Sequence, residues 1–205
     1  MKTLDGRLMV LAGASRSGKT AWARKAAGRD PRAFAWDPED QWARLPGWTR
    51  HTSAAAFAAA AMQPGAGRHA FVPGGLVPLQ SQFDFVCQCV FAAADRHGAL
   101  TFIAEELADV STPGKAPAHW GMLVRRGLKR GASIYAISQR WAEADKTCLG
   151  NASGFVIFRQ SSADDVKYLA RKTRVPAAEI DQLAPLQFVI YDAATQTHQA
   201  GKLKF

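Results

Sequence analysis

Short apolar runs alternate along the chain with longer segments in which apolar residues recur at helical spacing. Each apolar run is bounded by glycine, proline or charged residues, which is typical of buried β-strands. The expected strands cover residues 7–12, 33–36, 69–72, 100–104, 134–137, 155–158 and 188–191. The expected helices, the first closed by Gly28 and the second capped by Ser53, cover residues 20–27, 53–62, 83–96, 119–130 and 163–172.

This order of elements predicts the fold class. Strands that alternate with helices indicate an α/β fold with a mostly parallel central sheet flanked by helices. The 205 residues suffice for one domain with a substantial core, and neither an internal repeat nor a long linker divides them. We therefore expect a single domain over residues 1–205.

Composition narrows the functional classes. Lysine and arginine number 26 against 17 aspartates and glutamates, so the net charge is +9, an excess that attracts polyanions such as nucleic acids. The 3 cysteines have no partners at zinc-binding spacing, which argues against a disulfide scaffold or a structural zinc site. No apolar run approaches the ~20 residues of a membrane span. The N-terminus also lacks the shape of a signal peptide, so we expect a protein of the reducing cell interior.

One segment matches the phosphate-binding pattern G-x-x-x-x-G-K-[ST] in full. Its residues are Gly13, Ala14, Ser15, Arg16, Ser17, Gly18, Lys19 and Thr20. The glycines let successive backbone N–H groups point at phosphate oxygens, and the helix that follows presents its positive N-terminus to them. Lys19 is expected to reach the β- and γ-phosphates, and the Thr20 hydroxyl to ligate Mg²⁺. With a strand before it and a helix after it, this phosphate loop predicts a nucleoside triphosphatase.

Two acids follow the strand expected over residues 100–104. P-loop enzymes need a carboxylate at the end of a neighbouring strand to hold Mg²⁺, and those that hydrolyse ATP add a second carboxylate to activate water. We assign Glu105 to the Mg²⁺ shell and Glu106 to the general base. Adjacent side chains at a strand end point in opposite directions, so two separate tasks are expected. A solvated acidic pair at the start of a helix is the alternative.

A basic segment precedes the next expected strand. It contains Arg125, Arg126, Lys129 and Arg130. Their i,i+4 spacing predicts one cationic face of a helix. The function of this basic face stays open. One of its arginines could be a finger that reaches the γ-phosphate in a neighbouring subunit, the face could contact a DNA backbone, or it could be an ordinary solvated surface. After the strand, Gln139 is placed to sense the γ-phosphate or the attacking water.

In the order and spacing of these motifs, the chain resembles the FtsK/HerA superfamily of P-loop ATPases that pump DNA. The resemblance covers most of the chain, and its most discriminating part is the Ser-Gln-Arg segment after the basic residues. It rests on the phosphate loop, Trp36-Asp37-Pro38, the acids up to Glu106, residues 126–131 leading into Ser138-Gln139-Arg140, and the strand ending in Phe158-Arg159 before Asp164 and Asp165. One departure is Glu105, which stands where the family usually has aspartate.

The resemblance implies a RecA-like ATPase with a second catalytic acid. The short chain looks most like the genome-packaging ATPases of tailless icosahedral viruses with an internal membrane. Those ATPases are taken to form hexameric rings at a capsid vertex and to drive double-stranded DNA inward. The resemblance therefore implies ATP and Mg²⁺ as cofactors, and a location in the host cytoplasm or at the virion vertex. The implied partners are double-stranded DNA, further copies of the chain, and capsid or portal-vertex proteins.

The resemblance also implies which residues take part in catalysis and which subunit supplies each of them. It implies that ATP lies at a subunit interface, with Lys19, Glu106 and Gln139 from one subunit and an arginine from the next. The candidates for this arginine finger are Arg126 and Arg130, followed by Arg125, Arg140 and Arg159. The loop over residues 111–119, with Lys115, is the expected DNA contact.

Two other functions stay open. A phage assembly or extrusion motor of the zonular-occludens-toxin type belongs to the same superfamily but usually adds a membrane helix. A small-molecule kinase has a similar size and a phosphate loop, but it needs a mobile lid and generally lacks the second acid. Turnover of ATP with water rather than a metabolite as acceptor separates the ATPase from the kinase.

Overall fold

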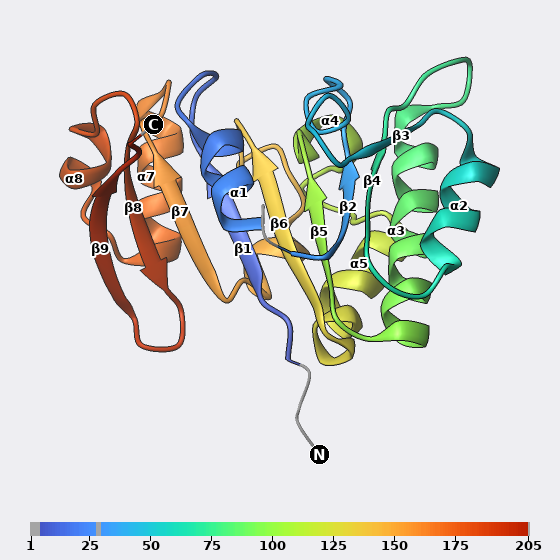
Figure 1. Ribbon diagram of the computed structural model, residues 1–205. Coiled ribbons are helices and arrows are strands. Elements are labelled where there is room, and N and C mark those ends of the chain that lie inside the picture. Colours follow the sequence, from blue (N-terminus) through green and yellow to red (C-terminus); the bar gives the residue numbers. More distant parts are fainter. Residues whose placement is uncertain (1–4, 28–29, 205) are drawn as a thin grey trace.

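The computed structural model describes residues 5–27 and 30–204, and within them the strands form one nine-stranded sheet (Figure 1). The strand order is β3-β4-β2-β5-β6-β1-β7-β8-β9. From β3 to β7 in this order all neighbours are parallel, whereas β8 and β9 continue the sheet antiparallel. The strands are β1 (Leu8–Ala12), β2 (Arg32–Trp36), β3 (Thr49–His51), β4 (Gly67–Phe71), β5 (Leu100–Ala104), β6 (Ala132–Ser138), β7 (Gly154–Phe158), β8 (Gln187–Asp192) and β9 (Thr197–Lys202). The predicted α/β fold with a mostly parallel sheet is confirmed.

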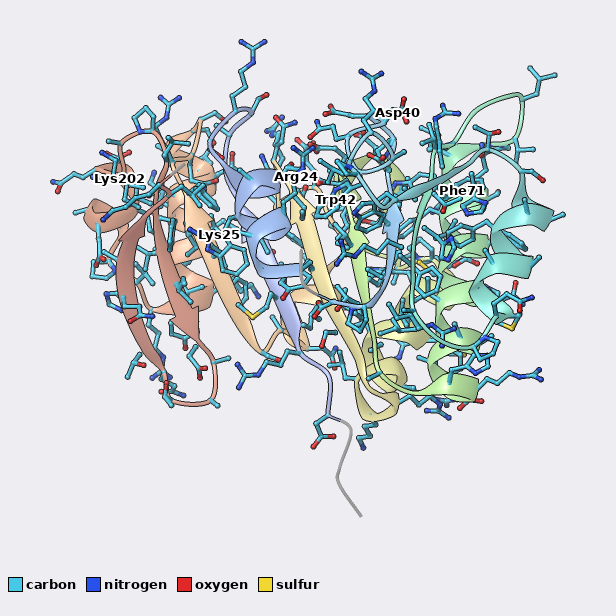
Figure 2. All side chains as sticks on the ribbon, viewed as in Figure 1. Arg24, Lys25, Asp40, Trp42, Phe71 and Lys202 are labelled. Carbon is cyan, nitrogen blue, oxygen red and sulfur yellow. The ribbon has the colours of Figure 1, made fainter. Side chains whose placement is uncertain are left out.

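Helices cover the two faces of this sheet unequally. They are α1 (Lys19–Ala27), α2 (Ala54–Met62), α3 (Leu79–His97), α4 (Leu107–Val110), α5 (Ala118–Met122), the π-helical turn η1 (Leu123–Gly127), the 3₁₀ turn η2 (Leu128–Arg130), α6 (Lys146–Gly150), α7 (Ala163–Thr173) and α8 (Ala177–Asp181). On one face, α2 to α8 pack a large core against alternate strand residues. On the other face, α1 and the segment around Trp42 form a smaller core (Figure 2).

Most of the expected elements are confirmed within a few residues of their predicted ends. Ser53 caps α2 as predicted, since its hydroxyl accepts a hydrogen bond from the Ala56 N–H at 3.4 Å. The hydrophobic pattern does not predict β3 and β9, which lie at the two edges of the sheet and are mostly exposed. Their polar sequences become strands by pairing with β4 and β8. Gly28, expected to close the first helix, lies outside the described residues.

The α-helix expected over residues 119–130 is wrong in its second half. There, α5 is followed by the π-helical turn η1 and the 3₁₀ turn η2, so the side chains do not follow a regular i,i+4 row. A Cβ at Gly127 would lie 2.7 Å from Leu123 Cδ1, so a larger residue there would displace the buried Leu123 side chain. The predicted cationic face is therefore irregular, although the Arg126 carbonyl still accepts a hydrogen bond from Arg130 at 3.3 Å.

The strand order brings distant motifs together. Strands β5, β6 and β1 are neighbours in the middle of the sheet, with Ala104 beside Ala136 and Ala12 beside Ser138. The segments that follow the carboxyl ends of these three strands lie together at that end of the strands, where ligands of such sheets bind. These segments are the phosphate loop, the acidic pair and Gln139.

Candidate active site

The phosphate loop, residues 13–20, wraps closely around its own backbone. A Cβ at Gly13 would lie 2.6 Å from Ser17 Oγ, and Gly18 has a φ of +115° that favours glycine. A Cβ at Gly18 would also lie 2.8 Å from Leu203 Cδ1, so the C-terminal segment packs directly against the loop. The Ser17 hydroxyl is buried and has no hydrogen-bond partner among the described residues. A tight loop with an unused donor fits a cradle for phosphate oxygens.

Lys19 lies inside this loop and is 6% exposed. Its ammonium donates hydrogen bonds to the carbonyls of Gly13 at 2.7 Å and Ala14 at 3.0 Å. Burial lowers the pKa of Lys19, and the nearby carboxylates of Glu106 and Glu105 oppose this shift. The cation is therefore placed between the loop and the two predicted acids, where phosphate oxygens can replace its carbonyl partners.

Glu105 directly follows β5 and is buried. Its Oε1 accepts a hydrogen bond from Trp42 Nε1 at 2.9 Å. Burial raises the pKa of Glu105 to about 7, although the bond from Trp42 and the nearby Thr20 hydroxyl act against this shift. A hydroxyl and a carboxylate are the hard oxygen ligands that Mg²⁺ prefers, so Thr20 and Glu105 fit the predicted metal position.

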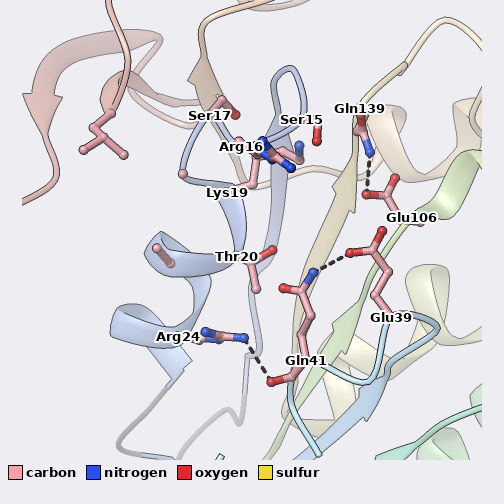
Figure 3. A pocket seen from close by; sticks show the side chains of 13 residues that line it. Ser15, Arg16, Ser17, Lys19, Thr20, Arg24, Glu39, Gln41, Glu106 and Gln139 are labelled. Atoms are coloured by element: carbon pink, nitrogen blue, oxygen red, sulfur yellow. Dashed lines mark hydrogen bonds between the residues drawn. The ribbon is translucent and has the colours of Figure 1, made fainter. Parts of the chain in front are cut away.

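Glu106 has a backbone conformation that residues other than glycine rarely adopt. Its φ of 47° and ψ of 55° are left-handed, so strand alternation does not set its direction. Its side chain lines the same cavity as Lys19. Gln139 Nε2 donates a hydrogen bond to Glu106 Oε1 at 2.9 Å (Figure 3). Burial raises the pKa of Glu106, while the bond from Gln139 lowers it.

The cavity that these residues surround has a volume of about 550 Å³ (Figure 3). This volume is in the range of small-molecule sites. The lining residues are Ser15, Arg16, Ser17, Gly18, Lys19, Thr20, Ala21, Arg24, Glu39, Gln41, Glu106, Gln139 and Leu186. The structure therefore gathers most of the predicted phosphate-loop residues, the predicted base and the predicted sensor around one space, and Glu105 adjoins it through Thr20.

Part of the cavity wall comes from a segment that the sequence reasoning did not assign to the site, residues 37–48, called here the 37–48 loop. Asp37 is 0% exposed and accepts hydrogen bonds from the backbone N–H groups of Gln41 at 2.7 Å and Trp42 at 2.9 Å. This arrangement brings Glu39 and Gln41 to the cavity. Arg24 of α1 donates to the Gln41 carbonyl at 3.0 Å, so the loop and α1 are connected. The Asp-Pro pair after the second strand was the available signal.

The first candidates for the arginine finger lie away from the cavity of their own chain. Arg126 and Arg130 precede β6, so they lie at the amino ends of the parallel strands, whereas Gln139 follows the carboxyl end of β6. Arg130 forms an ion pair with Asp95, and its guanidinium lies 4.9 Å from the centre of the Phe91 ring. Neither arginine acts on the cavity within one chain.

Two other candidate arginines lie at the same end of the sheet as the cavity, although neither lines it. Arg140 and Arg159 follow the carboxyl ends of β6 and β7. Arg140 pairs with Glu143 at 2.8 Å, and the Arg159 carbonyl accepts a hydrogen bond from the Ala14 N–H at 2.9 Å. Lys115 is exposed in the segment between α4 and α5, and its role in DNA contact stays a prediction.

Other ligand chemistry has little support in the described residues. Cys87, Cys89 and Cys148 are free and buried, and burial raises the pKa of each thiol. Over residues 5–27 and 30–204, no group of three His, Cys, Asp or Glu side chains is placed to hold a metal ion. No helix of the described chain has the length and apolar character needed to cross a membrane.

A curated relative covers most of the chain. Protein P9 of Pseudoalteromonas phage PM2 is 33% identical over 184 residues, which are 88% of this chain and 81% of protein P9. No protein-family model matches the chain.

Solved structures share the fold at lower identity. The genome packaging NTPase B204 of Sulfolobus turreted icosahedral virus 2, in complex with sulfate, has a TM-score of 0.78 at 15% identity over 98% of both chains. In complex with AMPPCP it has a TM-score of 0.76 at 16% identity, over 96% of this chain and 97% of that one. The bacterial conjugative coupling protein TrwBdeltaN70 has a TM-score of 0.68 at 10% identity, over 99% and 86% of the chains. These likenesses confirm the RecA-like fold.

Proposed function

The chain belongs to the same family as protein P9 of Pseudoalteromonas phage PM2, within the FtsK/HerA superfamily of P-loop ATPases, and we propose that it is an ATP-driven motor that packages a double-stranded DNA viral genome. In this proposal, ATP hydrolysis is coupled to the movement of DNA. The observation that carries it is the convergence of Lys19, Glu106 and Gln139 on one cavity. The structural likeness to a viral genome packaging NTPase supports it.

The phosphate loop supplies triphosphate binding in this proposal. Its backbone N–H groups, the Ser17 hydroxyl and the N-terminus of α1 offer donors and partial positive charge to phosphate oxygens. Lys19 adds a full positive charge at the same place. Thr20 and Glu105 would hold Mg²⁺, which when bound neutralises charge on the β- and γ-phosphate oxygens.

Glu106 is the general base in this proposal. It accepts a proton from the water that attacks the γ-phosphate, and its raised pKa brings it closer to the pH at which a base works best. The hydrogen bond from Gln139 fixes the orientation of the carboxylate. Because Gln139 also lines the cavity, it is placed to respond to the γ-phosphate.

A neighbouring copy of the chain completes the site in this proposal. Arg126 and Arg130 lie at the amino ends of the strands, away from the cavity of their own chain, so they would reach a cavity in another subunit. Arg140 or Arg159 are the alternative arginine fingers. We infer a ring, with a hexamer as the proposed form, at a capsid or portal vertex in the host cytoplasm or the virion. The net charge of +9 suits a channel around a DNA backbone.

Phosphate release with and without duplex DNA tests this function. We expect hydrolysis with water as acceptor, stimulation by DNA of any sequence, and loss of this stimulation as salt rises. Lys19→Ala should lose nucleotide binding, whereas Lys25→Ala, at an exposed position of the same helix, should match the parent. Glu106→Gln should bind ATP but hydrolyse it roughly 10²–10⁴-fold more slowly.

Light scattering with ATP and DNA tests the ring in the same samples. Ring-forming protein that hydrolyses ATP without any response to DNA would contradict the packaging proposal and favour an extrusion motor. Phosphate transfer to a metabolite instead of water would favour a small-molecule kinase.

A further inference from the structure

A buried tryptophan outside the phosphate loop and the acidic pair contacts the predicted metal ligand. Trp42 is 1% exposed, and its Nε1 donates the 2.9 Å hydrogen bond to Oε1 of Glu105, 63 positions away in the chain. Both side chains are buried, so water competes little for this bond. An indole N–H only donates, which makes Oε1 the obligatory acceptor.

The surroundings of Trp42 hold its ring in place. Its backbone N–H donates to the buried Asp37 carboxylate at 2.9 Å, at the end of β2. The Trp48 ring centre lies 5.2 Å from that of Trp42. The Arg24 guanidinium lies 5.9 Å from the centre of the Trp42 ring, and both residues are labelled in Figure 2. The indole therefore cannot turn away from Glu105 without disturbing the 37–48 loop and its contact with α1.

The Glu105 side chain needs such a fixed partner. Strand pairing of β5 with β2 and β6 fixes the backbone before it, but the terminal bond of a glutamate rotates in a broad energy well. The Thr20 hydroxyl alone would not define the plane of the carboxylate. A second hydrogen bond, from an immobile neutral donor, does define it without adding a charge that competes with a cation.

We propose that Trp42 is a positioning residue, whose indole N–H orients the Glu105 carboxylate toward Thr20 and the Mg²⁺ ion of a bound nucleotide. This inference rests on the proposed function. Loss of an outer hydrogen-bond partner typically weakens metal binding by about 10–100-fold. Trp42 does not line the cavity, so the effect should appear in metal binding and not in the contacts of the phosphate loop.

The test compares Trp42→Phe, which keeps an aromatic ring but lacks the N–H, with Trp120→Phe as the matched control, because Trp120 is also buried and donates its indole N–H to a different carboxylate, that of Asp145. Binding of Mn²⁺, in the presence of a non-hydrolysable ATP analogue, is measured by electron paramagnetic resonance. We expect Trp42→Phe to weaken Mn²⁺ binding by about 10-fold or more and Trp120→Phe to leave it unchanged. In phosphate release, the Mg²⁺ concentration for half-maximal rate should rise, while KM for ATP at saturating Mg²⁺ should stay constant.

A double-mutant cycle separates positioning from a general effect on packing. In the Glu105→Gln background the carboxylate is gone, so Trp42→Phe should have little further effect on Mn²⁺ binding. If Trp42→Phe does not fold, benzothienylalanine at position 42 keeps the bulk of the indole and replaces its N–H with sulfur. The same loss of Mn²⁺ affinity is expected from it.

The outcomes distinguish this inference from the proposed function. Parent-like Mn²⁺ binding by Trp42→Phe or by the benzothienylalanine variant would overturn the positioning role, and so would equal losses in both Glu105 backgrounds. If the parent protein bound no nucleotide and released no phosphate, the proposed function itself would fail.

Discussion

Gln139 donates a 2.9 Å hydrogen bond to Glu106, which joins the ends of two neighbouring strands, β6 and β5, at the cavity. Glu106 has a left-handed backbone, so its direction depends on this partner as well as on the strand before it. The predicted base and the predicted sensor are therefore one hydrogen-bonded unit, and a change at either residue should alter the other.

Removal of the amide should affect catalysis more than binding. Gln139→Leu is expected to lower kcat by roughly 10²-fold, because the Glu106 carboxylate loses the donor that orients it. Affinity for a fluorescent ATP analogue should change little, because the phosphate loop is intact. Lys146→Gln, an exposed change at the start of α6, serves as the control and should match the parent. Equal losses of binding and turnover in Gln139→Leu would contradict the prediction.

The left-handed backbone at position 106 should cost stability. Glycine adopts this conformation without the clash of a Cβ, so Glu106→Gly is expected to be more stable than Glu106→Ala by about 1 kcal/mol. Both variants lack the carboxylate, so the comparison isolates the backbone. Urea unfolding measures the difference, and an alanine variant at least as stable as the glycine variant would count against strain at this position.

Asp37 should be essential to the 37–48 loop. Its carboxylate accepts three backbone N–H groups, from Gln41, Trp42 and Ala43, at 2.7–2.9 Å. Asp37→Ala leaves these donors without their acceptor and is expected to lower the free energy of unfolding by about 2–4 kcal/mol. Asp40→Asn, in the same loop, changes only exposed ion pairs and should have a much smaller effect in the same denaturation experiment.

Acid should destabilise the fold through a histidine pair. His51 Nε2 lies 3.1 Å from His69 Nδ1, and burial is the main cause that lowers the pKa of each below the ordinary 6.5. The unfolded chain therefore takes up protons below about pH 6.5 that the two folded histidines resist, so the pair should lower stability as pH falls through this range, whereas Glu105, with a pKa raised to about 7, acts in the opposite direction. Melting temperatures between pH 7.5 and 5 measure the slope.

Variants of the two histidines test whether they cause the change of melting temperature with pH. A double change, His51→Asn with His69→Asn, should remove the contribution of the pair, so that the melting temperature falls less, or rises more, on acidification than in the parent. Gln199→Asn, on the exposed β9, removes no titratable group and should keep the slope of the parent. A double variant with an unchanged slope would show that other groups titrate.

The local pattern predicted the centre of the sheet well and its edges poorly. Apolar runs such as residues 8–12 and 100–104 are strands because both of their faces are buried. By contrast, β9 is almost entirely exposed and depends on its pairing with β8, which no local pattern reveals. The regular α-helix predicted over residues 119–130 was wrong in its second half, where π-helical and 3₁₀ turns replace it without a signal in the spacing of apolar residues.

The candidate site divides in the same way. The phosphate loop, the acidic pair and Gln139 follow apolar runs along the chain, so spacing alone predicted them. The bond between Trp42 and Glu105 requires β2 and β5 to be neighbours, which is a property of the strand order. The left-handed turn at Glu106 likewise has no signature in residue type, since glycine is the residue expected there.

Leu203 fills the space beside Gly18, and its N–H donates to the carbonyl of Leu186 at 3.0 Å, a residue of the cavity wall. The outermost hairpin of the sheet and the phosphate loop therefore share one piece of packing. Movement of β9 would therefore displace the side chain that packs against Gly18. The outer strand of the sheet is in this way linked by direct packing to the loop expected to bind phosphate.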